Sequence, residues 1–375
     1  MDNAYSDTPL AAKEAVRLPT YDPAAVMDAL EARGLKHSYP SLASYQSNIM
    51  VREHVIEKGR REWEATHSEL LARLKEGHEV DRTLLRRMHV EQLDLLAHIC
   101  MYVEDLAYVG YLLRHRLKSL DRSVYFNGTM RSQTLSEFAA LPSRSIRARF
   151  RLPVIARLGL KPGDVALVSE AFRTCIAGLA EDISTVKAFS TQGHFDIYNE
   201  YKHTFDILLG MGALEELNIH THIYARVAAR PKEKRRERTL ILDASREAIR
   251  RYQAVFVATS NLMNVLVQNT LSWMIYADGR YLVQIPSSYG LSSALLKPYA
   301  SLVESYDLGW AVQHSLQLEI GFAPKAARAI GKAIAESGVA KRSEPLFARR
   351  ASTRYSLAVQ RGTSSAGRAA AGSGG

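Results

Sequence analysis

The sequence predicts a mainly α protein: a multi-helix bundle with an inserted β-hairpin and a disordered basic C-terminal tail. Long segments with apolar residues at helical spacing support the bundle. The spacing changes to strict alternation only near residue 220, which supports the hairpin. A composition of 47% hydrophobic and 23% charged residues over 375 positions is typical of a soluble globular protein.

The sequence predicts an N-terminal arm over residues 1–45, followed by a helical domain over 46–340. Pro23 suits the first turn of a short helix that stops near Gly34, and a linker follows it. A charged helix is expected over 47–75. Asp81 is a fair N-cap for a second helix over 82–118, whose apolar residues nearly encircle it, so we expect this helix to be central and buried.

The middle of the chain is expected to alternate loops and helices. Residues 119–130 indicate a loop, and the Pro-, Gly- and Arg-containing stretch after Leu141 indicates an extended connector. Helices are then predicted over 165–189 and, after an interruption at Gly193, as far as about Leu209.

The hairpin follows near residues 218–243. "NIHTHIYARV" alternates apolar and polar residues, a charged turn comes next, and "TLILD" is the returning strand. Asp243 or Ser245 is then a fair N-cap for another helix. A short strand near residues 280–286 and two or three helices between 289 and 337 complete the expected domain.

Residues 252–277 contain no charged side chain, and the segment is long enough to cross a membrane. However, Asn261, Asn264 and Gln268 share one helical face, and amides at bilayer depth are costly. We therefore expect a core or oligomer-interface helix and no membrane association. A homo-oligomer would place these amides between subunits.

The charge of the chain indicates possible binding partners, and its cysteine content indicates the cellular compartment. The tail, residues 341–375, has seven basic residues and one acidic residue, and so carries six of the ten excess positive charges. It would touch RNA, DNA or an acidic surface nonspecifically, or simply keep the protein soluble. Two cysteines give no disulfide framework, and the N-terminus lacks the pattern of a signal peptide, so a cytoplasmic location is expected.

The stretch "YNEYKH", residues 198–203, is the candidate catalytic site. Helical spacing puts Asn199 and His203 on one face, with Lys202 beside it. An imidazole can act as a general base while Lys stabilises negative charge, and RNA cleavage without a metal requires such groups. The alternative is a solvated stripe, or one buried histidine held by hydrogen bonds.

This stretch resembles the R-N-x-x-x-H signature of HEPN proteins, which are helical-bundle proteins of bacterial toxin and defence systems. Asn199 matches the motif's Asn and His203 its His, whereas Tyr198 stands where the motif has Arg. The resemblance implies a metal-independent ribonuclease that works as a dimer. His203 would be the base or acid, Asn199 would orient it, and Lys202 would contact phosphate.

A cluster of arginines is the candidate nucleic-acid contact. Arg144, Arg147, Arg149 and Arg151 lie in a stretch free of acids, with Phe150 among them, and such residues can follow a phosphate backbone. An exposed, charged loop is the alternative interpretation.

No cofactor or metal site is expected. Glu-x-x-His spacing occurs at Glu64 with His67 and at Glu200 with His203, but solvated faces and a polar seam between helices explain it as well. Two functional hypotheses remain: an RNA-binding HEPN-like protein of a defence or stress system, and a non-catalytic protein that forms oligomers or docks a partner around Asn264.

Overall fold

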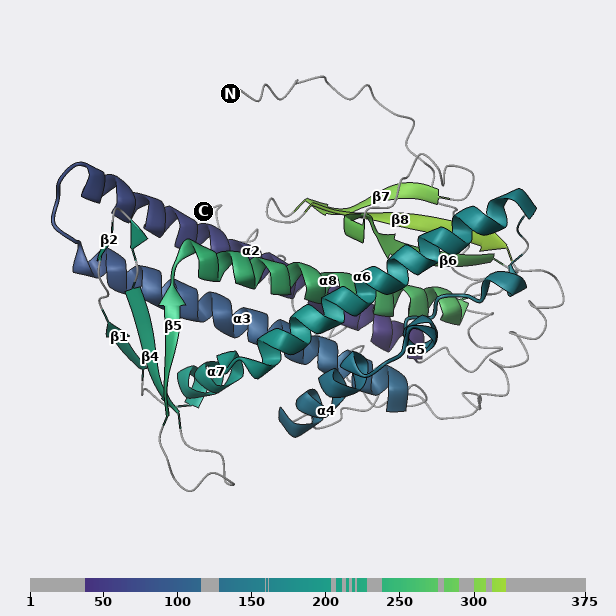
Figure 1. Cartoon of the computed structure of the whole chain (residues 1–375), viewed down its shortest axis with the longest axis horizontal. Coiled ribbons are helices and arrows are strands. Elements are labelled where there is room, and N and C mark those ends of the chain that lie inside the picture. Colours follow the sequence, from purple (N-terminus) through teal and green to yellow (C-terminus); the bar gives the residue numbers. More distant parts are fainter. Residues whose placement is uncertain are drawn as a thin grey trace, which may run out of the picture.

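The computed structural model describes residues 38–115, 128–158, 160, 162–203, 207–210, 214–215, 218–219, 221–227, 238–275, 280–289, 300–307 and 312–321. Long helices dominate these residues, which confirms the mainly α prediction (Figure 1). The expected short helix near Pro23 and the basic tail, 341–375, lie outside the described part of the chain.

Two antiparallel helices, α2 (Ser38–Lys75) and α3 (Arg82–His115), start the described fold. α2 begins nine residues earlier than predicted, because the expected linker is helical. Gly77, with φ of 82°, lies in the turn after α2. The predicted N-cap is confirmed: Asp81 Oδ1 accepts the backbone N–H groups of Thr83 (2.9 Å) and Leu84 (3.2 Å).

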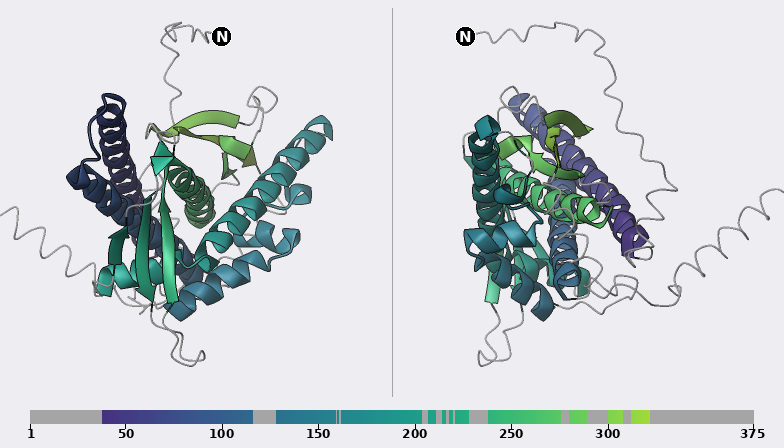
Figure 2. Two further views of the ribbon diagram at one scale, coloured as in Figure 1. Left: turned by 60° about the vertical axis from the view of Figure 1, so that its left-hand side comes forward. Right: turned by 90° about the vertical axis from the view of Figure 1, so that its right-hand side faces the viewer.

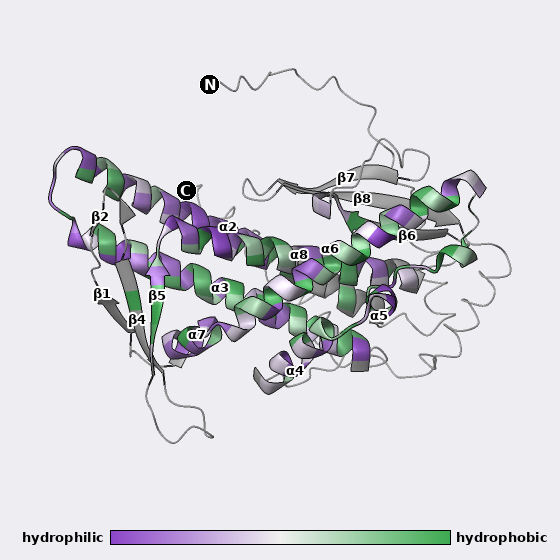
Figure 3. Cartoon of the chain, viewed as in Figure 1, coloured by the Kyte–Doolittle hydropathy of each residue, from purple (hydrophilic) through white to green (hydrophobic). Residues whose placement is uncertain are grey.

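The predicted burial of α3 is also confirmed. Leu95, Ile99, Val103 and Leu106 have no exposed surface, and α3 packs against α2, α4, α7 and α8. Figure 3 shows long hydrophobic stretches along α3 and many hydrophilic residues along α2. Of the described helices, α3 alone is long and apolar enough to cross a membrane, but 67% of its most apolar stretch is buried, as in the core helix of a soluble protein.

Two short helices occupy the stretches predicted as loop and connector. They are α4 (Gly128–Ala139) and α5 (Ser143–Arg149). Two 3-10 turns, η2 (Ile155–Arg157) and η3 (Pro162–Asp164), then lead into α6 (Val165–Thr191). α5 buries Ile146, and Phe150 follows it with no exposed surface. These apolar side chains make the segment part of the core and not an exposed connector.

The helix after Gly193 is shorter than predicted. α7 (His194–His203) ends six residues before the expected Leu209, and β1 (Ile207–Gly210) follows it. β1 pairs antiparallel with β4, the first strand of the hairpin. The run Ile207, Leu208, Leu209 fits a strand as well as a helix, so the spacing alone did not decide between them.

The predicted hairpin is confirmed. β4 (Thr221–Val227) and β5 (Arg238–Ala244) are antiparallel, with Ile223 opposite Leu242. Both of these side chains are buried, so this face of the sheet packs on the helices. Between β1 and β4, the short strands β2 (Leu214–Glu215) and β3 (Asn218–Ile219) form a separate pair.

The expectation of helices between residues 289 and 337 is wrong where the chain is described. β6 (Arg280–Pro286), β7 (Ala300–Asp307) and β8 (Val312–Gly321) form an antiparallel sheet in the order β6-β8-β7. Figure 2 shows this sheet at a different place on the helices from the β1-β4-β5 sheet. The alternation of Leu316, Leu318 and Ile320 with polar residues already carried the strand signal.

The long helix α8 (Arg246–Ile275) lies between the other layers, against α2, α3, α6 and β6. Ser245 is its N-cap, with Oγ accepting the N–H of Ala248 at 3.2 Å. Two amides of α8 have partners inside the protein: Asn261 donates to Asp182 (3.0 Å), and Asn269 to the Phe150 carbonyl (3.1 Å).

A polar junction joins α6 and α8 to η4 (Ser287–Tyr289), the 3-10 turn after β6. Asp182 Oδ2 accepts the hydroxyl of Tyr289 at 2.7 Å in addition to the Asn261 amide. Burial raises the pKa of Asp182 to about 6. The Tyr289 ring lies against Gly178 of α6, where a Cβ atom would overlap it.

We expect Gly178→Ala to lower the free energy of unfolding by about 1–3 kcal/mol, because the added methyl group displaces the Tyr289 ring. Thermal denaturation followed by circular dichroism measures the change. Gly163→Ala is the matched control, since its Cβ would meet no atom within 4 Å. Equal stability of the two variants would contradict the packing described here.

Candidate functional site

α7, the helix that carries the candidate catalytic residues, packs through one face onto the core. Phe195, Ile197 and Tyr198 are buried there, and α7 contacts α3, α6 and β4. Gly193, with φ of 83°, separates α7 from α6, because few residues other than glycine adopt this left-handed conformation. The break allows α7 to leave the direction of α6 and lie across α3.

Tyr198, at the position of the motif's Arg, is a packing residue. It is 5% exposed, and its ring makes an edge contact with Phe195 at 6.3 Å between centroids. Burial, and next the charge of Glu104, raise the pKa of the phenol to about 12. Arg52 and Arg131 are close enough to oppose that shift. A cationic side chain here would therefore point into the core.

The other residues of the motif lie toward solvent as far as they are described. Asn199 and Lys202 are exposed, and Lys202 Nζ lies 5.7 Å from the ring centroid of Tyr198. His203 is the last residue of α7, one helical turn after Asn199, but its side chain lies outside the described part of the chain. Asn199 and Lys202 are thus both accessible to solvent on α7.

Arg131 of α4 is a further cation beside α7, which the sequence did not single out. Its guanidinium carbon lies 3.7 Å from the ring centroid of Phe195, and Nη1 donates to Glu104 at 2.7 Å. Residue 131 directly follows the stretch expected to be a loop, and no local pattern in the sequence pairs it with Phe195.

The four predicted RNA-contacting arginines lie on and just after α5, in different environments. Arg144 is exposed. Arg147 is half-buried, and its Nε has no hydrogen-bond partner among the described residues. Arg149 lies 5.5 Å from the ring centroid of Phe138, and Arg151 lies 4.3 Å from that of Trp273. The last two guanidinium groups are thus placed on aromatic faces.

The surroundings of Arg149 are electropositive. Burial, and next the charge of Arg114, lower the pKa of its guanidinium, while Glu137 has the opposite effect. Glu137 is itself ion-paired with Arg114. Arg151 also acts against Arg149 and has a positive φ of 54°, which is uncommon for a residue with a Cβ atom. An approaching anion would relieve this repulsion.

α4 connects the two groups of cations. Arg131, near its start, lies on Phe195 of α7, and Phe138, at its other end, lies beneath Arg149. Phe138 comes seven residues after Arg131 in the helix, which is about 10 Å along the axis. Figure 1 shows α7, α4 and α5 following one another along the same side of the molecule. We call this surface the α5–α4–α7 surface.

Glu64 and His67, one of the two pairs with metal-ligand spacing, have other partners. Glu64 pairs with Arg60, and His67 stacks on Trp63 with 4.8 Å between ring centroids. Burial lowers the pKa of His67 to about 4, so this imidazole is neutral at pH 7. Among the described residues, no three His, Cys, Asp or Glu side chains are grouped closely enough to hold a metal ion.

The amides proposed for an oligomer interface are turned inward. Asn264 is 7% exposed and donates to Ser260 Oγ at 3.3 Å, while Gln268 is half-buried. Ser260 in turn donates to the buried carboxylate of Glu53. Within the described residues, Asn264 therefore belongs to an internal polar network between α8 and α2.

No family model matches the chain. Searches of curated proteins and of solved structures also give no match. The resemblance to HEPN proteins therefore stands on Asn199 and His203, and the function has to be argued from the geometry described above.

We expect Tyr198→Arg, which restores the full motif, to destabilise the fold by about 3 kcal/mol. The new cation would be buried near Arg52 and Arg131, and Glu104 is already bound by Arg131. Tyr198→Phe is the control, because it keeps the ring and should change stability by less than about 1 kcal/mol. Chemical denaturation measures both variants. A Tyr198→Arg protein as stable as wild type would contradict the packing of α7.

Proposed function

We propose that this protein is a HEPN-like RNA-binding protein of a bacterial defence or stress system. It binds single-stranded RNA on the α5–α4–α7 surface and cleaves it without a metal ion through His203. The observation that carries the proposal is the placement of Arg149 and Arg151 over the rings of Phe138 and Trp273, next to Arg114.

This arrangement suits a flexible polyanion. A planar guanidinium group can bind two phosphate oxygens at once, and stacking on an aromatic ring restricts its motion. Less side-chain entropy is then lost on binding than for a freely rotating lysine. Exposed Arg144 adds a further phosphate contact at the edge of the cluster. Single strands suit the site because their backbone bends to follow unevenly spaced cations.

α4 extends this binding surface toward α7. RNA that leaves Arg149 passes Lys187, whose Nζ lies 2.7 Å from Ser136 Oγ of α4, and reaches Lys202. Both lysines are point charges on flexible side chains, so they attract phosphate without selecting a base. The two lysines would therefore give the protein no preference for a particular RNA sequence, and the bases of the bound strand would stay unpaired.

The proposed cleavage uses the exposed residues of α7. The His203 imidazole takes the proton of a ribose 2′-hydroxyl, whose oxygen attacks the adjacent phosphorus. The bond from phosphorus to the 5′-oxygen breaks, and that oxygen takes a proton from solvent water, which leaves a 2′,3′-cyclic phosphate and a 5′-hydroxyl. The proton held by His203 then returns to solvent. Lys202 stabilises the negative charge on the phosphate, and Asn199 orients the imidazole by a hydrogen bond. Because Tyr198 is buried, Lys202 replaces the motif's Arg as the cation.

We expect Arg149→Gln with Arg151→Gln to weaken binding of a labelled single-stranded RNA at least tenfold. Two lost phosphate contacts should also reduce the slope of log K against log salt by about 1.4. Fluorescence anisotropy over a salt series measures both quantities. Arg250→Gln, an exposed arginine at the start of α8, should leave both unchanged. Unchanged binding by the double variant would refute the proposed surface.

We expect His203→Ala to abolish cleavage of RNA in the presence of a chelator while RNA binding remains within threefold of wild type. Gel analysis of end-labelled RNA, with detection of the cyclic phosphate, measures the reaction. His54→Ala, on the exposed side of α2, is the matched control and should retain full activity. Activity that survives in His203→Ala, or that requires a divalent metal, contradicts the proposed mechanism. Binding without cleavage by the wild type would confine the function to RNA binding.

A further inference from the structure

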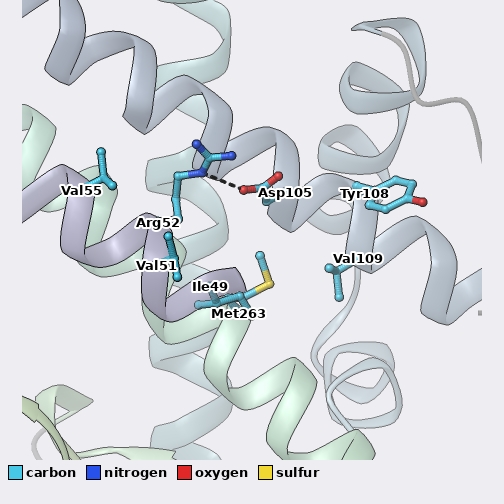
Figure 4. A pocket seen from close by; sticks show the side chains of 8 residues that line it. All are labelled: Ile49, Val51, Arg52, Val55, Asp105, Tyr108, Val109 and Met263. Carbon is cyan, nitrogen blue, oxygen red and sulfur yellow. Dashed lines mark hydrogen bonds and ion pairs between the residues drawn. The ribbon is translucent and has the colours of Figure 1, made fainter. Parts of the chain in front are cut away.

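A pocket of about 340 Å³ lies between α2, α3 and α8 (Figure 4). Its volume is about eleven times the 30 Å³ that one water molecule occupies in the liquid, so it has room for a small organic molecule. Most of its wall is aliphatic, formed by Ile49, Val51, Val55, Val109 and Met263.

One ion pair supplies the charges of the pocket. Arg52 Nε lies 3.1 Å from Asp105 Oδ2, and the two side chains are 28% and 45% exposed. Figure 4 shows this pair at one end of the pocket, with Ile49 and Met263 toward the other end. A ligand that enters therefore meets two opposite charges at one end and hydrocarbon at the other.

Both charged groups retain hydrogen-bonding capacity. Arg52 has five N–H donors. Among the described residues, one donates to Asp105 and one to the Met101 sulfur at 3.6 Å, which is a weak acceptor. In the same part of the chain, Asp105 accepts at Oδ2 only. Arg52 can thus bind an anion and Asp105 a cation while the ion pair between them stays intact.

The charge balance favours a ligand of no net charge. A carboxylate alone would bring a net negative charge to a partly apolar site beside Asp105, and an amine alone would bring a net positive charge beside Arg52. Desolvation of such an unbalanced charge is costly. A zwitterion completes a ring of four alternating charges and leaves the site neutral.

We propose that this pocket binds a small zwitterion with an apolar tail, of the class of α-amino acids with an aliphatic side chain. The ligand's carboxylate lies against Arg52 and its ammonium group against Asp105. Its side chain extends between Val109 and Met263. None of the residues proposed to bind RNA lines this pocket, so ligand binding here does not depend on the proposed RNA binding.

Three ligands with the same six-carbon chain test the charge requirement: L-norleucine, hexanoate and hexylamine. Isothermal titration calorimetry and the shift in melting temperature are measured for each. We expect norleucine to bind and to raise the melting temperature, and the other two to bind at least tenfold more weakly. Equal binding of hexanoate or hexylamine would overturn the proposal, as would no binding of norleucine at concentrations of about 10 mM.

Substitutions in the pocket test whether norleucine binds there. Arg52→Gln should weaken norleucine binding at least tenfold. Val51→Phe should do the same by narrowing the mouth, and because Val51 is 64% exposed, this change leaves the free protein's melting temperature near that of wild type. Arg61→Gln, on an exposed part of α2, is the matched control and should bind norleucine as wild type does. Wild-type affinity in both Arg52→Gln and Val51→Phe would overturn the assignment to this pocket.

Discussion

Burial of α3 is the constraint on which the described fold depends. A helix with apolar residues on nearly every side is stable in water only when other elements cover it, and each fully buried leucine or isoleucine contributes about 1.5–3 kcal/mol. α2, α4, α7 and α8 provide that cover. α4 and α7 both lie against α3, and Arg131 of α4 contacts Phe195 of α7. The continuity of the α5–α4–α7 surface is thus a consequence of core packing.

The polar groups inside the bundle are arranged around the same core. Tyr102 of α3 donates to Glu53 of α2 at 2.5 Å, and Ser260 of α8 donates to the same carboxylate. Burial raises the pKa of Glu53, which reflects the cost of a charge in this position. Hydrogen bonds that join these three helices at one carboxylate favour one register of the helices over its neighbours. The uncharged stretch of α8 is therefore a core segment, in which Asn261, Asn264 and Asn269 have partners in the same chain.

Local signals in the sequence were enough for part of this structure. The burial of α3, the caps at Asp81 and Ser245, and the alternating strands of the hairpin each depend on residues close together in the chain. Of the second sheet, the strand β6 was predicted near residues 280–286, but β7 and β8 were missed. Leu316 and Leu318 alternate with polar residues, yet the segment after residue 289 was interpreted as helical. The spacing of residues in the sequence does not predict interactions between residues that are far apart in the chain. No pattern in the sequence predicts that Arg131 lies on Phe195 or that Arg151 lies on Trp273. The burial of Tyr198 likewise depends on how α7 packs against α3.

The junction of Asp182 with Tyr289 gives the molecule an unusual response to acid. Most carboxylates in proteins hold their protons less tightly after folding, so acid weakens the native state. Asp182 behaves in the opposite way, because its pKa of about 6 is above the ordinary value of 3.8. Its contribution to stability is full below pH 4 and is lost as the pH rises through 6. As the pH rises through 6, ionisation of this buried carboxyl group therefore costs stability where the β6-β8-β7 sheet meets the helices, and the hydrogen bonds from Tyr289 and Asn261, which favour the charged form, offset only part of that cost.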